Sequence, residues 1–170
     1  MTGDMQQAKR PVSAMLAGPY GHPFHPILVT VPIGAWVASV VFDIASHVVD
    51  DPQFLARGSE WLIALGVLGA LAAAAVGFLD LFAIPTGTSA FRTGLVHMSL
   101  NLAVTVAFAI DFWWRRSDGG PHGAVPMGPL VLSIVTLAVL AVSGYLGGKL
   151  VFHYGVRVVD ETTQAIGYRR

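Results

Sequence analysis

Four long apolar segments run along the chain, separated by short polar stretches. No Asp, Glu, Lys or Arg lies between Pro26 and Phe42, and none lies within residues 119–148. A membrane-spanning helix needs about 20 mostly apolar residues. The pattern therefore predicts an all-α integral membrane protein, built as an up-down-up-down four-helix bundle. The predicted spans cover residues 26–47, 61–85, 93–114 and 127–151.

The transmembrane domain is expected over residues 21–156, between polar tails at 1–20 and 157–170. Only 12 % of the residues are charged, whereas soluble domains carry roughly 25 %. The formal net charge is zero, which argues against nucleic acid as a partner, so the lipid bilayer is the expected surrounding. The chain contains no cysteine, which excludes disulfides and thiolate-ligated clusters.

Lysine and arginine are distributed unequally between the two ends of the predicted bundle. The end with both termini carries seven of them: Lys9, Arg10, Arg92, Lys149, Arg157, Arg169 and Arg170. The other end carries three: Arg57, Arg115 and Arg116. Positive residues favour the cytoplasmic side, so both termini are expected in the cytoplasm.

Small residues follow one face of the second span. They fall at i, i+4, i+7 and i+11, as Gly66, Ala70, Ala73 and Gly77. A face without bulky side chains lets another helix, or a flat ligand, approach closely.

Polar side chains are expected to gather at the end that carries the termini. His22 and His25 each precede a proline, which favours an extended backbone before a helix that starts near Pro26. His97 lies about one turn inside the third span, and we expect His25 as its nearest histidine partner. The neighbouring polar groups are Asn101, Asp80, Arg92, Lys149 and His153. Ionisable groups inside a membrane are expensive and commonly functional.

Two structural interpretations of this cluster require no bound ligand. Asp80 is expected to form a structural ion pair with Arg92 across a short loop. His97 could hydrogen bond to Asn101, to Asp80 or to the backbone. At the opposite end Asp43, His47, Asp111 and His122 gather, with Arg57, Arg115 and Arg116 available as partners. There the two aspartates are expected to mark helix ends rather than a proton path.

These motifs resemble the bacterial membrane family called domain of unknown function 2231. The resemblance rests on the His22-Pro23-Phe24-His25-Pro26 opening and its apolar continuation, on Gly77-Phe78-Leu79-Asp80 with Ile84-Pro85, on His97 with Asn101, and on Gly147–Val151 with Tyr154-Gly155-Val156. It implies a four-helix protein of the bacterial cytoplasmic (inner) membrane and no established activity. Some relatives carry a Rieske-type iron–sulfur domain, so a Rieske-type partner of this chain would be a separate redox protein.

The first functional hypothesis is a redox subunit that binds haem b or a quinone inside the bundle. Haem is held by two histidines on different helices, with small residues beside the ring. His25 and His97 are the candidate ligands, with Asn101 and Gly77 beside them.

The second hypothesis is a transition-metal site. Imidazole and carboxylate groups suit zinc, copper, nickel or iron. The candidate ligands are His22, His25, His97, His153 and Asp80. The third hypothesis is a non-catalytic membrane anchor or assembly subunit of a larger complex, in which the polar cluster holds the helices together. The expected protein partner is a Rieske-type redox protein or a second copy of the chain in a homo-oligomer.

The charge distribution makes a topology prediction. Reporter fusions after Arg170 and within residues 117–126 should report opposite sides of the membrane, with the C-terminal fusion cytoplasmic. A periplasmic C-terminus with a cytoplasmic loop would reverse the predicted orientation.

Overall fold

The computed structural model describes residues 2–13, 18, 21, 23–117, 119–120 and 122–168, and within these residues it is all-helical, without a strand. The helices in chain order are α1 (Thr2–Lys9), α2 (Phe24–Leu28), α3 (Thr30–Ala45), α4 (Gln53–Leu81), α5 (Ser89–Ser117), α6 (Met127–Gly148), a π-helical turn at Lys149–His153, and α7 (Glu161–Ile166). The predicted all-α class is confirmed.

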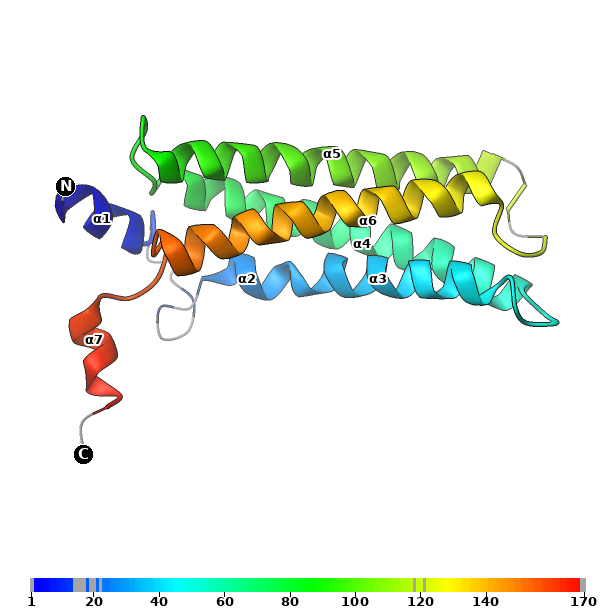
Figure 1. Cartoon of the computed structure of the whole chain (residues 1–170), viewed down its shortest axis with the longest axis horizontal. Coiled ribbons are helices and arrows are strands. Elements are labelled where there is room, and N and C mark those ends of the chain that lie inside the picture. The colour runs from blue at the N-terminus through cyan, green and yellow to red at the C-terminus, as the bar shows by residue number, and fades with distance from the viewer. Residues whose placement is uncertain are drawn as a thin grey trace.

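Four helical stretches are long and apolar enough to cross a membrane. They are Phe24–Ala45, Gln53–Leu81, Ser89–Ser117 and Met127–His153. Figure 1 shows α3, α4, α5 and α6 side by side along the long axis, joined by short connections at alternate ends. Both described termini lie at one end of this arrangement.

The apolar core joins all four helices. The rings of Trp36 and Phe108 stack with their centroids 4.4 Å apart and their planes at 12°. Ile63, Val104 and Leu140 complete this buried cluster. The indole N–H of Trp36 donates a hydrogen bond to the Ile63 carbonyl at 3.3 Å, so α3 is tied to α4 by a polar contact inside the core.

The first span is interrupted at Val29, between α2 and α3. The cause is Pro32, which has no N–H for the carbonyl of Leu28 four residues earlier. A proline within an apolar span predicts such a break from the sequence alone, and the structure shows it between Leu28 and Thr30. The span itself begins at Phe24 and ends at Ala45, two residues earlier than predicted at each end.

The second span begins earlier than its apolar segment. The sequence predicts a polar connection over residues 47–60, but α4 already begins at Gln53. The reason is that Ser59 and Glu60 lie on a buried face of this extension, at 0 % and 4 % exposure. Polar residues with buried partners allow a helix to continue past the stretch that hydropathy identifies.

The two tails pack against each other at the end that carries the termini. The Arg157 N–H donates to the Ala8 carbonyl at 2.9 Å, and Lys9 Nζ lies 3.0 Å from Glu161 Oε1. Asp160 caps α7 by accepting the Thr163 N–H at 2.9 Å, a hydrogen bond that lowers the pKa of this carboxyl below its usual value. Residues 157–168 therefore fold back towards α1.

The small-residue face of α4 packs on the first span. A Cβ atom on Gly66 would lie 2.3 Å from the Trp36 indole nitrogen, and one on Gly77 would lie 2.7 Å from the His25 ring. Of the two interpretations of this face, the structure supports close helix packing, with the His25 imidazole covering Gly77.

Gly66→Ala should therefore destabilise the bundle. The added methyl group collides with an indole that is only 2 % exposed, and overpacking of this kind lowers the unfolding free energy by about 1–3 kcal/mol. Gly34→Ala is the matched control, because no heavy atom lies within 4 Å of its Cβ position and alanine favours a helix interior over glycine by about 0.5–1 kcal/mol. Unfolding titrations in detergent should rank Gly34→Ala at or above the wild type. Equal stability of the two variants would contradict the packing.

Candidate functional site

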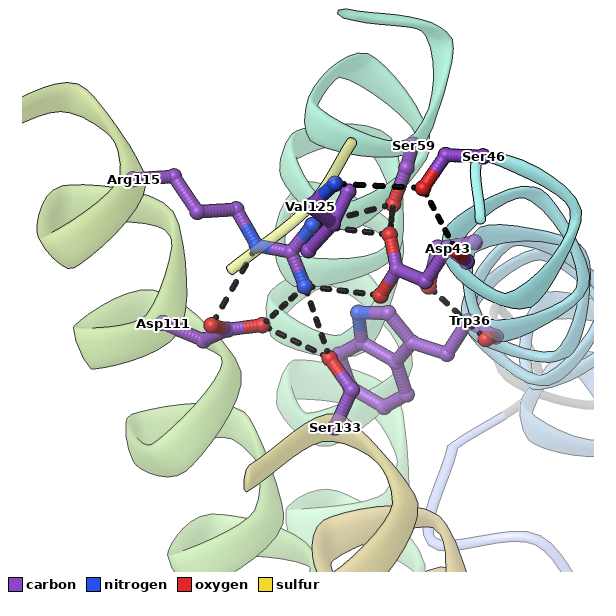
Figure 2. Close-up of polar contacts among 9 residues, drawn as sticks. Trp36, Asp43, Ser46, Ser59, Asp111, Arg115, Val125 and Ser133 are labelled. Carbon is purple, nitrogen blue, oxygen red and sulfur yellow. Dashed lines mark hydrogen bonds and ion pairs between the residues drawn. The ribbon is translucent and has the colours of Figure 1, made fainter. Parts of the chain in front are cut away.

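Among the described residues, polar side chains gather in a cluster towards each end of the bundle. The first, which we call the Arg115 network, lies at the end opposite the termini. Its members are Asp43 on α3, Ser59 on α4, Asp111 and Arg115 on α5, and Ser133 on α6. Each of the four long helices contributes at least one side chain (Figure 2).

One guanidinium group joins both carboxylates of this network. Arg115 donates from Nη1 and Nη2 to the two Asp43 oxygens, both at 2.8 Å. It donates from Nε and Nη2 to the two Asp111 oxygens at 3.2 and 3.0 Å. Such bidentate charge-assisted pairs are the strong form of the ion pair.

Two serines complete the network. Ser59 Oγ donates to Asp43, and Ser133 Oγ donates to Asp111 at 2.7 Å. Arg115 Nη1 also donates to Ser59 Oγ at 3.3 Å. All five N–H groups of the guanidinium therefore donate hydrogen bonds. Both carboxylates are 0 % exposed, and every carboxylate oxygen accepts a hydrogen bond. A buried charge is tolerated when it is paired and hydrogen-bonded in this way.

The network extends to the loop between α5 and α6. Ser46 Oγ donates to the Asp43 carbonyl at 2.6 Å and accepts the Val125 N–H at 3.1 Å (Figure 2). The sequence correctly predicts that Asp43 and Asp111 meet an arginine. Both lie in the last third of their helices, and both side chains are fully buried. No sequence signal distinguishes Ser46 and Ser59 from other serines.

The second polar cluster is the histidine pair, His25 on α2 and His97 on α5. Their ring centroids lie 6.4 Å apart and the ring planes meet at 88°. The predicted proximity of these two histidines is therefore confirmed. They belong to different helices and approach each other inside the end that carries the termini.

Each imidazole is anchored through the same nitrogen. His25 Nδ1 lies 2.9 Å from the Ala73 carbonyl on α4, and His97 Nδ1 lies 2.8 Å from the Ser143 carbonyl on α6. A carbonyl can only accept, so we assign the proton to Nδ1 in both rings. In a neutral ring Nε2 then carries the lone pair, which is the electron pair that binds a metal.

Glycine and Asn101 complete the surroundings of the pair. Gly77 lies against the His25 ring, and a Cβ on Gly147 would lie 3.0 Å from His97 Cε1. Asn101 Nδ2 donates to the His97 carbonyl at 2.9 Å and lies 3.2 Å from His97 Nε2. The expected hydrogen bonds of His97 to Asn101 and to the backbone are thus present.

The ion pair of Asp80 differs from the predicted one. Its carboxylate pairs with Arg157 at 3.1 Å and not with Arg92. The cause is the backbone after the π-helical turn, where Arg157 adopts a φ of 60°. This uncommon left-handed conformation for a non-glycine residue accompanies the return of the tail towards α4.

The predicted metal-ligand set is not assembled. His153 is exposed and packs edge-on against Tyr154, with ring centroids 4.9 Å apart. Lys149 lies over the same tyrosine, its Nζ 5.5 Å from the ring centroid. His22 lies outside the described residues. Among the residues that are described, no three His, Asp or Glu side chains come close enough to hold a metal ion.

Comparison with known proteins supports the membrane architecture. Residues 21–160 match a family described as "Predicted membrane protein (DUF2231)". No curated protein matches the chain, and no solved structure matches it.

Arg115→Leu should be among the most damaging single substitutions. It leaves two buried carboxylates without their cation, and breaking a buried pair in this way costs about 3–5 kcal/mol of unfolding free energy. Arg92→Leu removes an exposed arginine from the same helix and should change stability by less than about 0.5 kcal/mol. Detergent-to-denaturant titrations monitored by tryptophan fluorescence would measure both. A loss of less than about 1 kcal/mol in Arg115→Leu would contradict the central place of this arginine.

Proposed function

The chain belongs to the DUF2231 family of membrane proteins, and we propose that its bundle holds a haem b, which the imidazoles of His25 and His97 would bind. The proposal makes the protein a redox subunit of the membrane. The observation that carries it is the pair of imidazoles, from two helices, at 6.4 Å.

The number of donors favours haem over a free metal ion. A structural zinc site uses four protein ligands and a catalytic site three, whereas in haem the macrocycle supplies the equatorial nitrogens and the protein supplies the axial ligands. The described residues bring two imidazoles together and no set of three donors. Two is the number that a six-coordinate haem requires.

The spacing of the rings also suits two ligands of one iron. With metal–nitrogen bonds of about 2.0–2.1 Å, imidazoles on opposite sides of one ion have centroids about 6 Å apart. The distance between His25 and His97 is 6.4 Å. Histidines that bind metals almost always donate their other N–H to a carboxylate, a backbone carbonyl or water, as both Nδ1 atoms do here.

Asn101 and two glycines are the neighbours that such a ligand would meet. A bond to His97 Nε2 would replace the 3.2 Å contact with the Asn101 amide. Asn101 would keep its 2.9 Å hydrogen bond to the His97 carbonyl. Gly77 and Gly147 leave space for the His25 and His97 rings, because a side chain at either position would displace a ring.

Haem supplies one-electron chemistry when it is bound. The chain's own part is to hold two imidazoles in one tautomer and to keep them within an apolar bundle. A separate redox protein, such as a Rieske-type protein, would be the partner that exchanges electrons with this subunit at the bacterial cytoplasmic membrane.

A visible absorption spectrum of the protein purified with haem available tests the proposal. The wild type should show a Soret band that His25→Ala and His97→Ala each abolish. His47→Ala and His122→Ala are matched controls, because these exposed histidines lie at the other end and should leave the band unchanged.

Three results would count against haem. A blank visible spectrum with a stoichiometric bound metal would favour the metal site, with His22 as a further ligand to test. A blank spectrum without metal would favour the anchor or assembly subunit. A Soret band that survives His97→Ala would exclude His97 as a ligand.

A further inference from the structure

A cavity of about 290 Å³ opens at the end opposite the termini, where α4 begins and α5 ends. Arg57, Arg116 and His122 line it, together with Glu60 and Trp61. Neither the Arg115 network nor the histidine pair contributes to this lining. From its charge and its position relative to the membrane surface, we propose that the cavity binds the phosphate headgroup of an anionic phospholipid.

Arg116 is preorganised for such a phosphate. Its Nε pairs with the carboxylate of Glu60, which is 4 % exposed. Its guanidinium carbon lies 5.5 Å from the centroid of the Phe112 ring. These contacts orient the guanidinium through one edge and one face. The two terminal NH₂ groups remain as donors, in the planar fork that recognises phosphate oxygens.

Among the described residues that line the cavity, two arginines stand against one glutamate. Glu60 neutralises Arg116, while Arg57 has no ion-pair partner among the residues that the structure describes. Gly119 and Gly120 also line the cavity; their φ values are 84° and 83°, and the His122 ring lies against Gly119. An anion is the ligand that satisfies this balance.

The position of the cavity relative to the membrane surface indicates that the anion belongs to a lipid. Trp61, Trp113 and Trp114 are 65 %, 69 % and 45 % exposed, and exposed tryptophans of membrane proteins gather at the level of the headgroups. Arg57 lies four residues before Trp61 on α4, and Arg116 lies three residues after Trp113 on α5. Both arginines are therefore about 5 Å outward of the tryptophans, where the phosphates of the bilayer are found.

Native mass spectrometry of the full chain in detergent tests this site with phosphatidylglycerol, phosphatidylcholine and inorganic phosphate as probes. The wild type should retain phosphatidylglycerol more tightly than phosphatidylcholine. Arg57→Gln and Arg116→Lys should each weaken phosphatidylglycerol binding about tenfold, because each variant loses about one charge-assisted hydrogen bond to the phosphate. The lysine in Arg116→Lys keeps a positive charge next to Glu60, so this variant isolates the loss of the fork.

Arg92→Gln is the matched control, because it removes an exposed arginine at the other end of α5 and should leave phosphatidylglycerol binding unchanged. A thermal melt by circular dichroism confirms that each variant is folded. Unchanged phosphatidylglycerol affinity in both Arg57→Gln and Arg116→Lys would overturn the site. Displacement of the lipid by millimolar inorganic phosphate, or equal retention of the two lipids, would overturn the lipid assignment.

Discussion

The pairing of Arg115 with two buried aspartates is the interaction on which the bundle depends. Inside a low-dielectric protein neither a guanidinium nor a carboxylate is tolerated alone. Asp43 and Asp111 are fully buried, and Arg115 bonds to both oxygens of each. The serines of α4 and α6 complete the arrangement, so each long helix is held in register by the same cation. Rotation of α3 or α5 would leave a buried charge without its partner, and rotation of α4 or α6 would remove a serine hydroxyl from a carboxylate.

The two ends of the bundle are consequently different in kind. At the Arg115 end the donors and acceptors satisfy one another, and the network uses its polar groups for structure. At the other end each imidazole donates a hydrogen bond from Nδ1 to a backbone carbonyl. The second nitrogen, which in His97 lies 3.2 Å from the Asn101 amide, is the group from which a ligand site can be built. Glycines on α4 and α6 decide where these rings lie, which links the small-residue face of the second span to the candidate site.

Hydropathy and proline chemistry account for most of the fold in advance. They predict the four spans, the break before Pro32 and the meeting of His25 with His97, because these depend on helix periodicity and on which end of a helix a residue occupies. The partner of Asp80 could not be predicted, since Arg157 reaches it only through the left-handed backbone after the π-helical turn. The early start of α4 was missed for a related reason: Ser59 and Glu60 look like loop residues until their partners on α3 and α5 are known. The roles of Ser46, Ser59 and Ser133 likewise emerge only from the packing.

The account's central functional claim is that His25 and His97 bind one ligand together. Low-temperature electron paramagnetic resonance of the oxidised, haem-loaded protein tests this directly, because the signal reports the number and orientation of the axial ligands. With ring planes at 88°, the account predicts the strongly anisotropic low-spin ferric signal of two imidazoles in nearly perpendicular planes. It also predicts that His25→Ala and His97→Ala each abolish this signal. A high-spin signal in the wild type, or a low-spin signal that persists in either variant, would contradict the shared site.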